Sequence, residues 1–301
     1  MVLMAGLEPA RLTARDFKSP VSAIPPHQRV ISLYAFPEGL SSLGDWMKRK
    51  TARIGSVMLG DGMPAICIPV LGATIEAIAQ SAARAKAAQA DLLELRMDSL
   101  SAMPTAQEAI AACNAAKESA PELPVLFTLR TKRDGGAGSE APEAYEALLG
   151  AMIDSGACDA VDCELSVGAE AFSRISAKAR AAGVTMVGSS HEFGEIGDMQ
   201  RAASWLLAQQ ELGADICKAA VMTKDSVEAL EAALVFARVK EQLNIPMIGI
   251  AMGPAGVITR ICGVCIGSCL TFGTAGEASA PGQIEAKRLR AALETVQSAI
   301  G

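Results

Sequence analysis

The sequence lacks the features that mark membrane, secreted and nucleic-acid-binding proteins. It contains no stretch of about 18 uncharged apolar residues, the length that crosses a bilayer, and no continuous apolar segment typical of an export signal near its start. Lys and Arg are not gathered with aromatic residues, and the formal net charge is -6. These absences predict a cytoplasmic protein whose partner is a small molecule rather than a membrane or a nucleic acid.

Aromatic residues are scarce, at 4% of the chain, although half of the residues are hydrophobic. This composition favours small-residue helices packed on buried aliphatic strands. Eight cysteines occur in the sequence, and in a reducing compartment we expect them to be small buried hydrophobes. Cys262, Cys265 and Cys269 are closely spaced, but no fourth metal ligand accompanies them, so we predict core packing rather than a metal site.

The first 46 residues differ from the rest of the chain. Pro20, Pro25, Pro26 and Pro37 interrupt them, and no helical or strand period is sustained. One interpretation is a poorly ordered N-terminal extension. The other is that translation begins at Met47, and either way we expect residues 47–301 to form the folded domain.

From Ala65 onward, short apolar runs alternate with Ala-rich amphipathic stretches. Helical patterns lie between and after the runs, near residues 74–90, 105–118, 142–156, 168–182, 197–212, 225–242, 255–264 and 283–299. The apolar runs occupy residues 65–70, 91–98, 124–131, 160–166, 184–193, 214–222, 246–253 and 268–273. Such alternation is typical of parallel strands covered by helices. Eight units predict a (β/α)8 barrel; a doubly wound open sheet is the alternative, but its Gly-rich phosphate-binding pattern does not follow the first run.

Charged and polar residues recur near the carboxyl ends of these runs, where a (β/α)8 barrel builds its active site. One charge inside a buried strand is usually explained by a structural ion pair. Here at least five successive runs carry such groups at the same end, which favours a shared site. The residues are Glu94, Arg96 and Asp98, Arg130, Asp162 and Glu164, His191, Lys218, Arg260, and Ser279 and Gln283.

Lys218 lies among apolar and small residues in the run ADICKAAV. Burial would lower the pKa of its amine and make it a nucleophile toward a ketone or aldehyde; the alternative is a lysine paired with Glu164 or Asp162. His191 ends the preceding run and suits proton transfer, although loop hydrogen bonds would also explain it. The second of the two histidines, His27, lies in the Pro-rich segment.

Several stretches, in this order, resemble the type I 3-dehydroquinate dehydratase family from about Met47 to the C-terminus. They are ELRMD (94–98), FTLR (127–130), SSHEF (189–193), CKAAVM (217–222), MGPAGVITR (252–260), LTFG (270–273) and SAPGQI (279–284). The resemblance implies a homodimeric (β/α)8 barrel that needs neither a cofactor nor a metal. It also implies the substrate, 3-dehydroquinate, and the product, 3-dehydroshikimate, of the shikimate pathway.

The same resemblance implies a role for each site residue. Lys218 would form an imine with the C3 ketone, and His191 would remove the C2 proton and then protonate the leaving C1 hydroxyl. The substrate-binding residues would be Arg260 at the carboxylate, with Ser279 and Gln283 nearby, and Glu94, Arg96 and Arg130 at the ring.

Two positions depart from the family pattern. Pro69 lies at the end of the first apolar run, where some members place a small hydroxyl residue, so the resemblance implies no polar substrate contact there. Asp134 stands four residues after Arg130, where many members carry a Glu that supports the catalytic histidine. The resemblance therefore assigns Asp134 to the support of His191, and because Asp is one methylene shorter, we expect retained activity with a looser histidine.

Two other functions stay open at this point. A class I Schiff-base aldolase-like lyase would share the barrel and the buried lysine, with Arg260 and the turn at 253–256 as a phosphate site. A non-catalytic ligand-binding barrel is the third possibility, and only the departure at Asp134 points to it.

Overall fold

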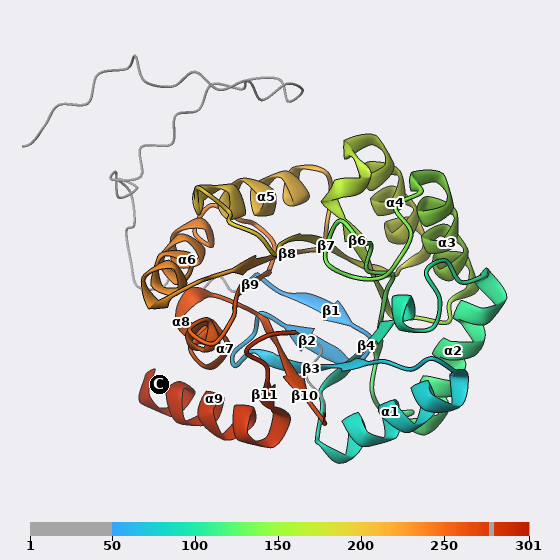
Figure 1. The fold of residues 1–301 in the computed structure, drawn as a ribbon, viewed down its shortest axis with the longest axis horizontal. Coiled ribbons are helices and arrows are strands. Elements are labelled where there is room, and N and C mark those ends of the chain that lie inside the picture. Colours follow the sequence, from blue (N-terminus) through green and yellow to red (C-terminus); the bar gives the residue numbers. More distant parts are fainter. Residues whose placement is uncertain (1–49, 277–279, 301) are drawn as a thin grey trace, which may run out of the picture. The chain divides into compact units, whose positions relative to one another are not determined.

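The structure, a computed structural model, describes residues 50–276 and 280–300, which form a barrel of parallel strands surrounded by helices (Figure 1). The extension expected at 1–46 lies outside the described residues, so its order stays a prediction. The barrel strands are β3 (Ala65–Val70), β4 (Leu92–Arg96), β5 (Val125–Thr128), β6 (Ala160–Glu164), β7 (Thr185–Glu192), β8 (Ile216–Met222), β9 (Met247–Met252) and β10 (Leu270–Thr274).

These strands pair in parallel in chain order from β3 to β9, and β10 pairs with β3. The two edges of the sheet meet where the Cys269 N–H donates to the Met247 carbonyl at 2.8 Å. A short strand, β11 (Ile284–Glu285), is attached in parallel to the outside of β10. The predicted (β/α)8 barrel is therefore confirmed, and the open doubly wound sheet is wrong.

Helices follow the strands around the outside of the barrel. Except at 255–264, each begins and ends close to the predicted residues, and local signals mark several of the ends. Thr105 begins one helix by forming a capping box with Glu108, and Gly156 and Gly183 end two others in left-handed C-cap conformations. The helices are α1 (Ile75–Ala87), α2 (Ala106–Ser119), α3 (Pro142–Ser155), α4 (Ala169–Ala182), α5 (Gln200–Glu211), α6 (Ser226–Val239), α7 (Val257–Ile261), α8 (Gly263–Ile266) and α9 (Ala286–Ile300).

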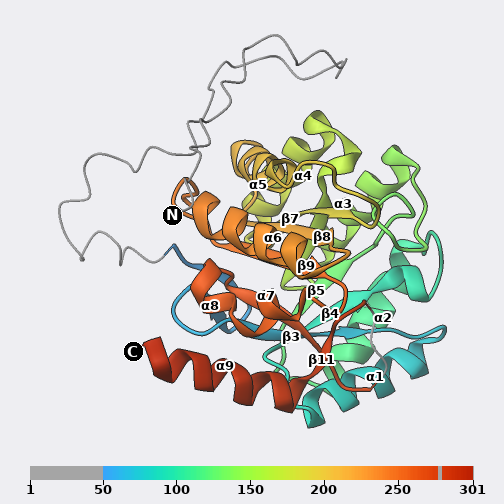
Figure 2. The same cartoon turned by 60° about the vertical axis from the view of Figure 1, so that its left-hand side comes forward.

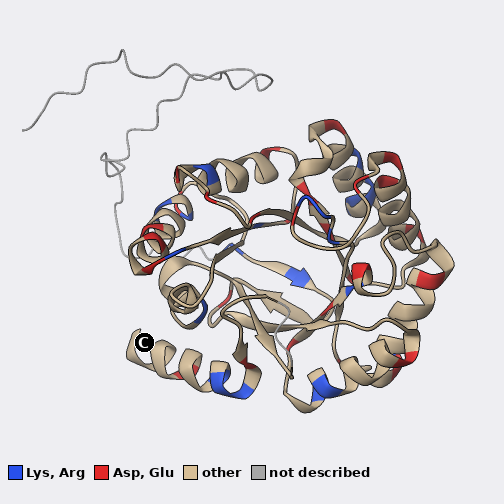
Figure 3. Cartoon of the chain, in the orientation of Figure 1, with Lys and Arg blue, Asp and Glu red and all other residues tan. Residues whose placement is uncertain are grey.

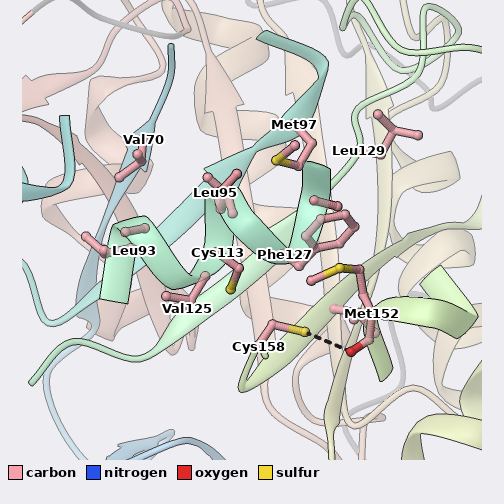
Figure 4. Close-up of a cluster of buried hydrophobic side chains, with 14 of the residues drawn as sticks. Val70, Leu93, Leu95, Met97, Cys113, Val125, Phe127, Leu129, Met152 and Cys158 are labelled. Carbon is pink, nitrogen blue, oxygen red and sulfur yellow. Dashed lines mark hydrogen bonds between the residues drawn. The ribbon is translucent and has the colours of Figure 1, made fainter. Parts of the chain in front are cut away.

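The main hydrophobic core lies between the strands and the helices that cover them. Figure 4 shows Leu93, Leu95 and Phe127 of the sheet packed near Cys113 of α2 and Met152 of α3. All five residues have no exposed surface, and burying such side chains contributes about 1.5–3 kcal/mol each for the larger ones. This packing fixes the strands, and therefore the side chains that face the barrel axis.

A second core fills the inside of the barrel, and a hairpin that was not predicted from the sequence completes it at the amino ends of the strands. Strands β1 (Ala52–Ile54) and β2 (Val57–Leu59) form an antiparallel hairpin around Gly55, whose φ of 54° favours glycine. Ile54 and Leu59 are buried against inward-facing strand residues such as Leu126. The hairpin therefore closes the amino end of the barrel and leaves the carboxyl end open for a site.

Two smaller expectations need correction. The single helix expected at 255–264 is divided into α7 and α8 at Cys262. At Gly263, where α8 begins, an added Cβ would lie 2.9 Å from the Pro64 ring. Core packing is wrong for Cys265, which is exposed, and for Cys262, which is partly exposed, whereas Cys269 is buried as predicted. Across the ranges 50–276 and 280–300, no helix combines the length and apolar character needed to cross a membrane.

Candidate active site

A cavity of about 580 Å³, a volume that includes space open to solvent, lies at the carboxyl ends of the barrel strands. Charged residues occur on these strands as well as on the outer helices (Figure 3), and the cavity collects many of them. Ser279 lies outside the described residues. Among the other residues expected at the shared site, Asp98, Asp162 and Glu164 do not line this cavity. The rest do, namely Lys218, His191, Asp134, Glu94, Arg96, Arg130, Arg260 and Gln283.

Lys218 is buried on β8, at 4% exposure, with its amine at the cavity wall. Its Nζ atom is 3.9 Å from a carboxylate oxygen of Glu94 and 3.9 Å from one of Asp162, distances beyond a hydrogen bond. The amine also lies 4.6 Å from the centre of the Phe272 ring. Burial lowers the pKa of Lys218, and the charge of Arg130 acts in the same direction, while the two carboxylates oppose them. The amine is therefore easier to deprotonate than that of an exposed lysine.

Arg130 lies behind Lys218 and satisfies the buried carboxylates. Its Nη1 donates to Glu164 at 2.9 Å and to Ser189 at 3.0 Å, and its Nη2 donates to Asp162 at 2.9 Å. Glu164 is thus held by Arg130 and does not pair with Lys218. Of the two carboxylates considered as partners of the lysine, Asp162 is the one near its amine, at 3.9 Å. Asp162 contacts both cations; burial acts to raise its pKa, but the charges of Arg130 and Lys218 lower it below the usual value. Arg130, which itself lines the cavity, is therefore held in place by a buried network of charged groups.

His191 is held by Asp134 through two contacts to one oxygen. The imidazole Nδ1 lies 3.0 Å from Asp134 Oδ2, and the His191 backbone N–H donates to the same atom at 3.1 Å. Burial lowers the pKa of His191 well below its usual value, and the charges of Arg130, Lys218 and Arg96 act in the same direction. With a proton on Nδ1, the neutral ring keeps Nε2 available as a base. The shorter Asp134 side chain therefore still contacts the histidine.

The loop after β5 brings Asp134 to the histidine. The Ala137 N–H donates to Asp98 Oδ2 at 3.1 Å, which ties the loop to the end of β4. At Gly136 an added Cβ would lie 2.2 Å from the Arg130 carbonyl oxygen, so this close approach requires glycine. The Gly-rich segment is therefore a means of placing a carboxylate.

Arg96 and Asp98 form a bidentate ion pair at the rim. The Nε and Nη2 atoms of Arg96 donate to the two oxygens of Asp98, each at 2.9 Å. Strand alternation by itself would place Asp98 on one face with Glu94 and Arg96, but the strand has ended before Asp98, because the chain turns into a short 3-10 helix at Met97–Ser99. The pair forms through this turn, and it fixes the guanidinium of Arg96 at the cavity wall.

Arg260, on α7, is a buried cation with neutral partners. It is 2% exposed, and its Nη atoms donate to the carbonyls of Phe272 and Pro281 at 3.4 and 3.3 Å. Its Nε has no partner among the residues that the structure describes. Burial lowers the pKa of Arg260 to about 10. A buried guanidinium of this kind suits the binding of an anion from the cavity.

The apolar part of the cavity wall was not predicted from the sequence. Phe193 stacks on His191 with ring centroids 6.5 Å apart and an interplanar angle of 17°. Phe272, Ile250 and Met252 line the wall near Lys218. All four lie in apolar runs or family-like stretches, but an apolar residue at a strand end looks the same in sequence whether it faces a site or the core.

Side chains that could bind a metal ion are not clustered in the part of the chain that the structure describes. Within 50–276 and 280–300, no group of three or more His, Cys, Asp or Glu side chains is arranged to hold a metal ion. The spacing of Cys262, Cys265 and Cys269 therefore does not produce a metal-binding cluster in the folded chain.

Comparisons with known proteins show the family of this chain. Residues 66–300 match the family model for type I 3-dehydroquinase. The 3-dehydroquinate dehydratase of Escherichia coli O1:K1 / APEC is 34% identical over 251 residues, 83% of this chain and 100% of the relative. The corresponding protein of Albidiferax ferrireducens is 33% identical over 248 residues, 82% of this chain and 94% of the relative.

Solved structures give the same result. The type I 3-dehydroquinate dehydratase of Clostridium difficile superposes with a TM-score of 0.79 at 30% identity, covering 84% of this chain and 100% of that one. The 3-dehydroquinate dehydratase of Geobacillus kaustophilus superposes with a TM-score of 0.79 at 32% identity, covering 83% and 97%. The chain therefore belongs to the type I 3-dehydroquinase family and is an enzyme of the hydro-lyase class.

Proposed function

We propose that the protein dehydrates 3-dehydroquinate to 3-dehydroshikimate through an imine on Lys218, with His191 as general base and acid. The neutral amine of Lys218 adds to the C3 carbonyl and water leaves, which forms a C=N bond. Protonated, this imine accepts the electron pair of the C2–H bond when His191 Nε2 removes the proton. The imidazolium then protonates the C1 hydroxyl, which leaves as water, and a further water hydrolyses the imine.

The observation that carries this proposal is the shared cavity of Lys218 and His191. A lysine amine with no hydrogen-bonded carboxylate and a lowered pKa suits attack on a carbonyl. A neutral imidazole held at Nδ1 by Asp134 suits removal of a proton at Nε2. An α-proton beside a simple ketone is too weakly acidic for imidazole, so the chemistry needs both groups together.

The rest of the cavity supports binding of a hydroxylated carboxylate. Arg260 supplies a buried cation whose Nε lacks a partner within the described part of the chain, and a substrate carboxylate would supply one. Arg96 and Glu94 present a donor and an acceptor for ring hydroxyls, with Gln283 on the wall. We assign Ser279 to the carboxylate side from the sequence resemblance alone.

Borohydride trapping tests the covalent step. The protein is incubated with 3-dehydroquinate and sodium borohydride, digested, and mapped by mass spectrometry. We expect the added mass on the peptide with Lys218, and none in Lys218→Met. Lys224→Met is the matched control, because Lys224 is exposed and pairs with Glu228 at 2.6 Å. The Lys224→Met protein should still be labelled on Lys218.

His191→Asn separates imine formation from elimination. This variant should still be labelled at Lys218. The enone absorbance of the product should appear more slowly than with the wild-type protein, by a factor on the order of 100 or larger. A wild-type protein without label and without enone absorbance would contradict the proposal and support a non-catalytic barrel. Label that appears only with a phosphorylated ketose or aldose would support the aldolase-like alternative.

We also propose that two copies associate through α6. Three of its large apolar residues, Val227, Leu230 and Leu234, are 64%, 54% and 49% exposed, and their spacing places them on one face. Figure 2 shows α6 on the outside of the barrel. Glu231 and Arg238 lie on either side of Leu234 along the helix. Two antiparallel α6 helices that meet at Leu234 would therefore place each Glu231 beside the Arg238 of the other copy. This self-complementary charge favours a second copy over an unrelated partner.

Charge reversal tests that surface. By sedimentation, the wild-type protein should be a dimer, Glu231→Arg should weaken it, and the double variant with Arg238→Glu should restore it. A monomeric wild-type protein, or a double variant no better than the single one, would contradict the proposal.

A further inference from the structure

Gln209 is a buried polar side chain that the proposed chemistry does not use. It lies on α5, outside the barrel, and none of its surface is exposed. A buried amide is costly unless its polar atoms are bonded, and every one of them here has a partner. The Oε1 atom accepts the Lys218 backbone N–H at 2.8 Å, while Nε2 donates to the Lys218 carbonyl at 3.1 Å and to Ser190 Oγ at 3.0 Å.

These three bonds converge on the backbone that carries the proposed nucleophile and base. Two of them hold both backbone groups of Lys218, on β8. The third holds Ser190, which lies on β7 directly before His191 and pairs in register with Ala219, next to Lys218. One amide therefore connects the positions from which the amine and the imidazole project into the cavity.

The neighbouring strand leaves room for this contact. Gly188 lies on β7, facing α5, and a Cβ added there would lie 3.1 Å from the Cβ of Gln209 and 2.7 Å from the Phe172 ring. A larger residue at position 188 would displace one of these neighbours. The missing side chain therefore allows the glutamine to approach the sheet.

We propose that Gln209 is a positioning residue that sets the distance between the Lys218 amine and the His191 imidazole. The inference rests on the proposed function, because it concerns the same two groups. A shift of about 1 Å in a reacting group can cost on the order of 100-fold in rate. The residues proposed to bind substrate, such as Arg260 and Arg96, stand on other elements, so loss of the amide should lower kcat and leave KM nearly unchanged.

Gln209→Met tests this, because it keeps the length of the side chain and removes all three bonds. We expect kcat to fall by roughly ten- to 100-fold, KM to change less than about twofold, and borohydride trapping on Lys218 to slow with kcat. Gln210→Met is the matched control: the same change one residue along α5 removes a bond to the Asn244 N–H instead. Its kcat should stay within about twofold of the wild-type value.

Two further variants keep the inference falsifiable. Leu206→Ala, in the α5 core, should lower the thermal midpoint without lowering kcat; an equal loss of kcat would mean that destabilisation alone explains Gln209→Met. Gln209→Glu keeps an acceptor for the Lys218 N–H, so its kcat should lie between those of the wild-type protein and Gln209→Met. This variant provides a test even if Gln209→Met does not fold. Wild-type kcat in Gln209→Met or Gln209→Glu would overturn the inference. Failure of wild-type protein to label at Lys218 would instead overturn the proposed function.

Discussion

Substitution of Asp134 by Asn and by Ala gives two different expected rates, because one oxygen of Asp134 accepts both the backbone N–H and Nδ1 of His191. An amide oxygen in that place can keep both bonds, so Asp134→Asn should preserve the ring orientation and the proton on Nδ1. What it loses is the negative charge beside the imidazolium that forms when the C2 proton is taken. Asp134→Ala loses the charge and both bonds.

The magnitudes follow from the strengths of these bonds. A hydrogen bond to a charged group contributes about 1.5–3 kcal/mol and a neutral one about 0.5–1.5 kcal/mol. Asp134→Asn should therefore raise the barrier by about 1–1.5 kcal/mol, which is roughly a five- to twelvefold loss of kcat. Asp134→Ala should cost roughly ten- to 150-fold, since the whole charged bond is removed.

Both variants should still be labelled at Lys218 by borohydride, and kcat is read from the enone absorbance under saturating substrate. Asp154→Asn is the control for removal of one carboxylate charge, because Asp154 pairs with Lys178 on the helix surface. If Asp134→Asn is slower than Asp134→Ala, the amide nitrogen faces the ring and reverses its tautomer. If Asp134→Ala has the wild-type rate, Asp134 does not support His191 and the reasoning is refuted.

Two further predictions concern stability. Arg130→Met should lower the free energy of unfolding by about 3–5 kcal/mol in urea, because it leaves buried carboxylates without their cation; Arg174→Met, at an exposed ion pair, should change it little. The pKa of His191 in the folded chain lies below the unfolded value near 6.5. As the pH falls, the unfolded chain therefore takes up a proton before the folded chain does. The stability of the folded chain is complete above about pH 6.5 and decreases below it. That loss reaches at most about 1.4 kcal/mol at about pH 5.5; urea titrations of His191→Asn should show a smaller pH dependence, and an unchanged one would contradict the assigned cause.

The order of strands and helices was predictable from the sequence because each element carries its own local signal. The run at 65–70 matches β3 residue for residue, and α3 and α4 end at glycines that take the left-handed conformation. The positions of Lys218 and His191 at the open end follow from that order, since parallel strands present their carboxyl ends together. The hairpin at Ala52–Leu59 escaped because two three-residue strands are too short to show a period.

What only the tertiary structure decided is which partners each site residue has. Asp134 and His191 are 57 residues apart, and Gln209 reads in sequence as one more polar position of an amphipathic helix. Likewise, sequence alone allowed Glu164 to pair with Lys218, whereas the folded chain gives it to Arg130. The residue types and their strand-end positions are local properties of the chain, but hydrogen bonds and charge pairs form across strands, and distances of about 3 Å are set only when packing fixes the strands side by side.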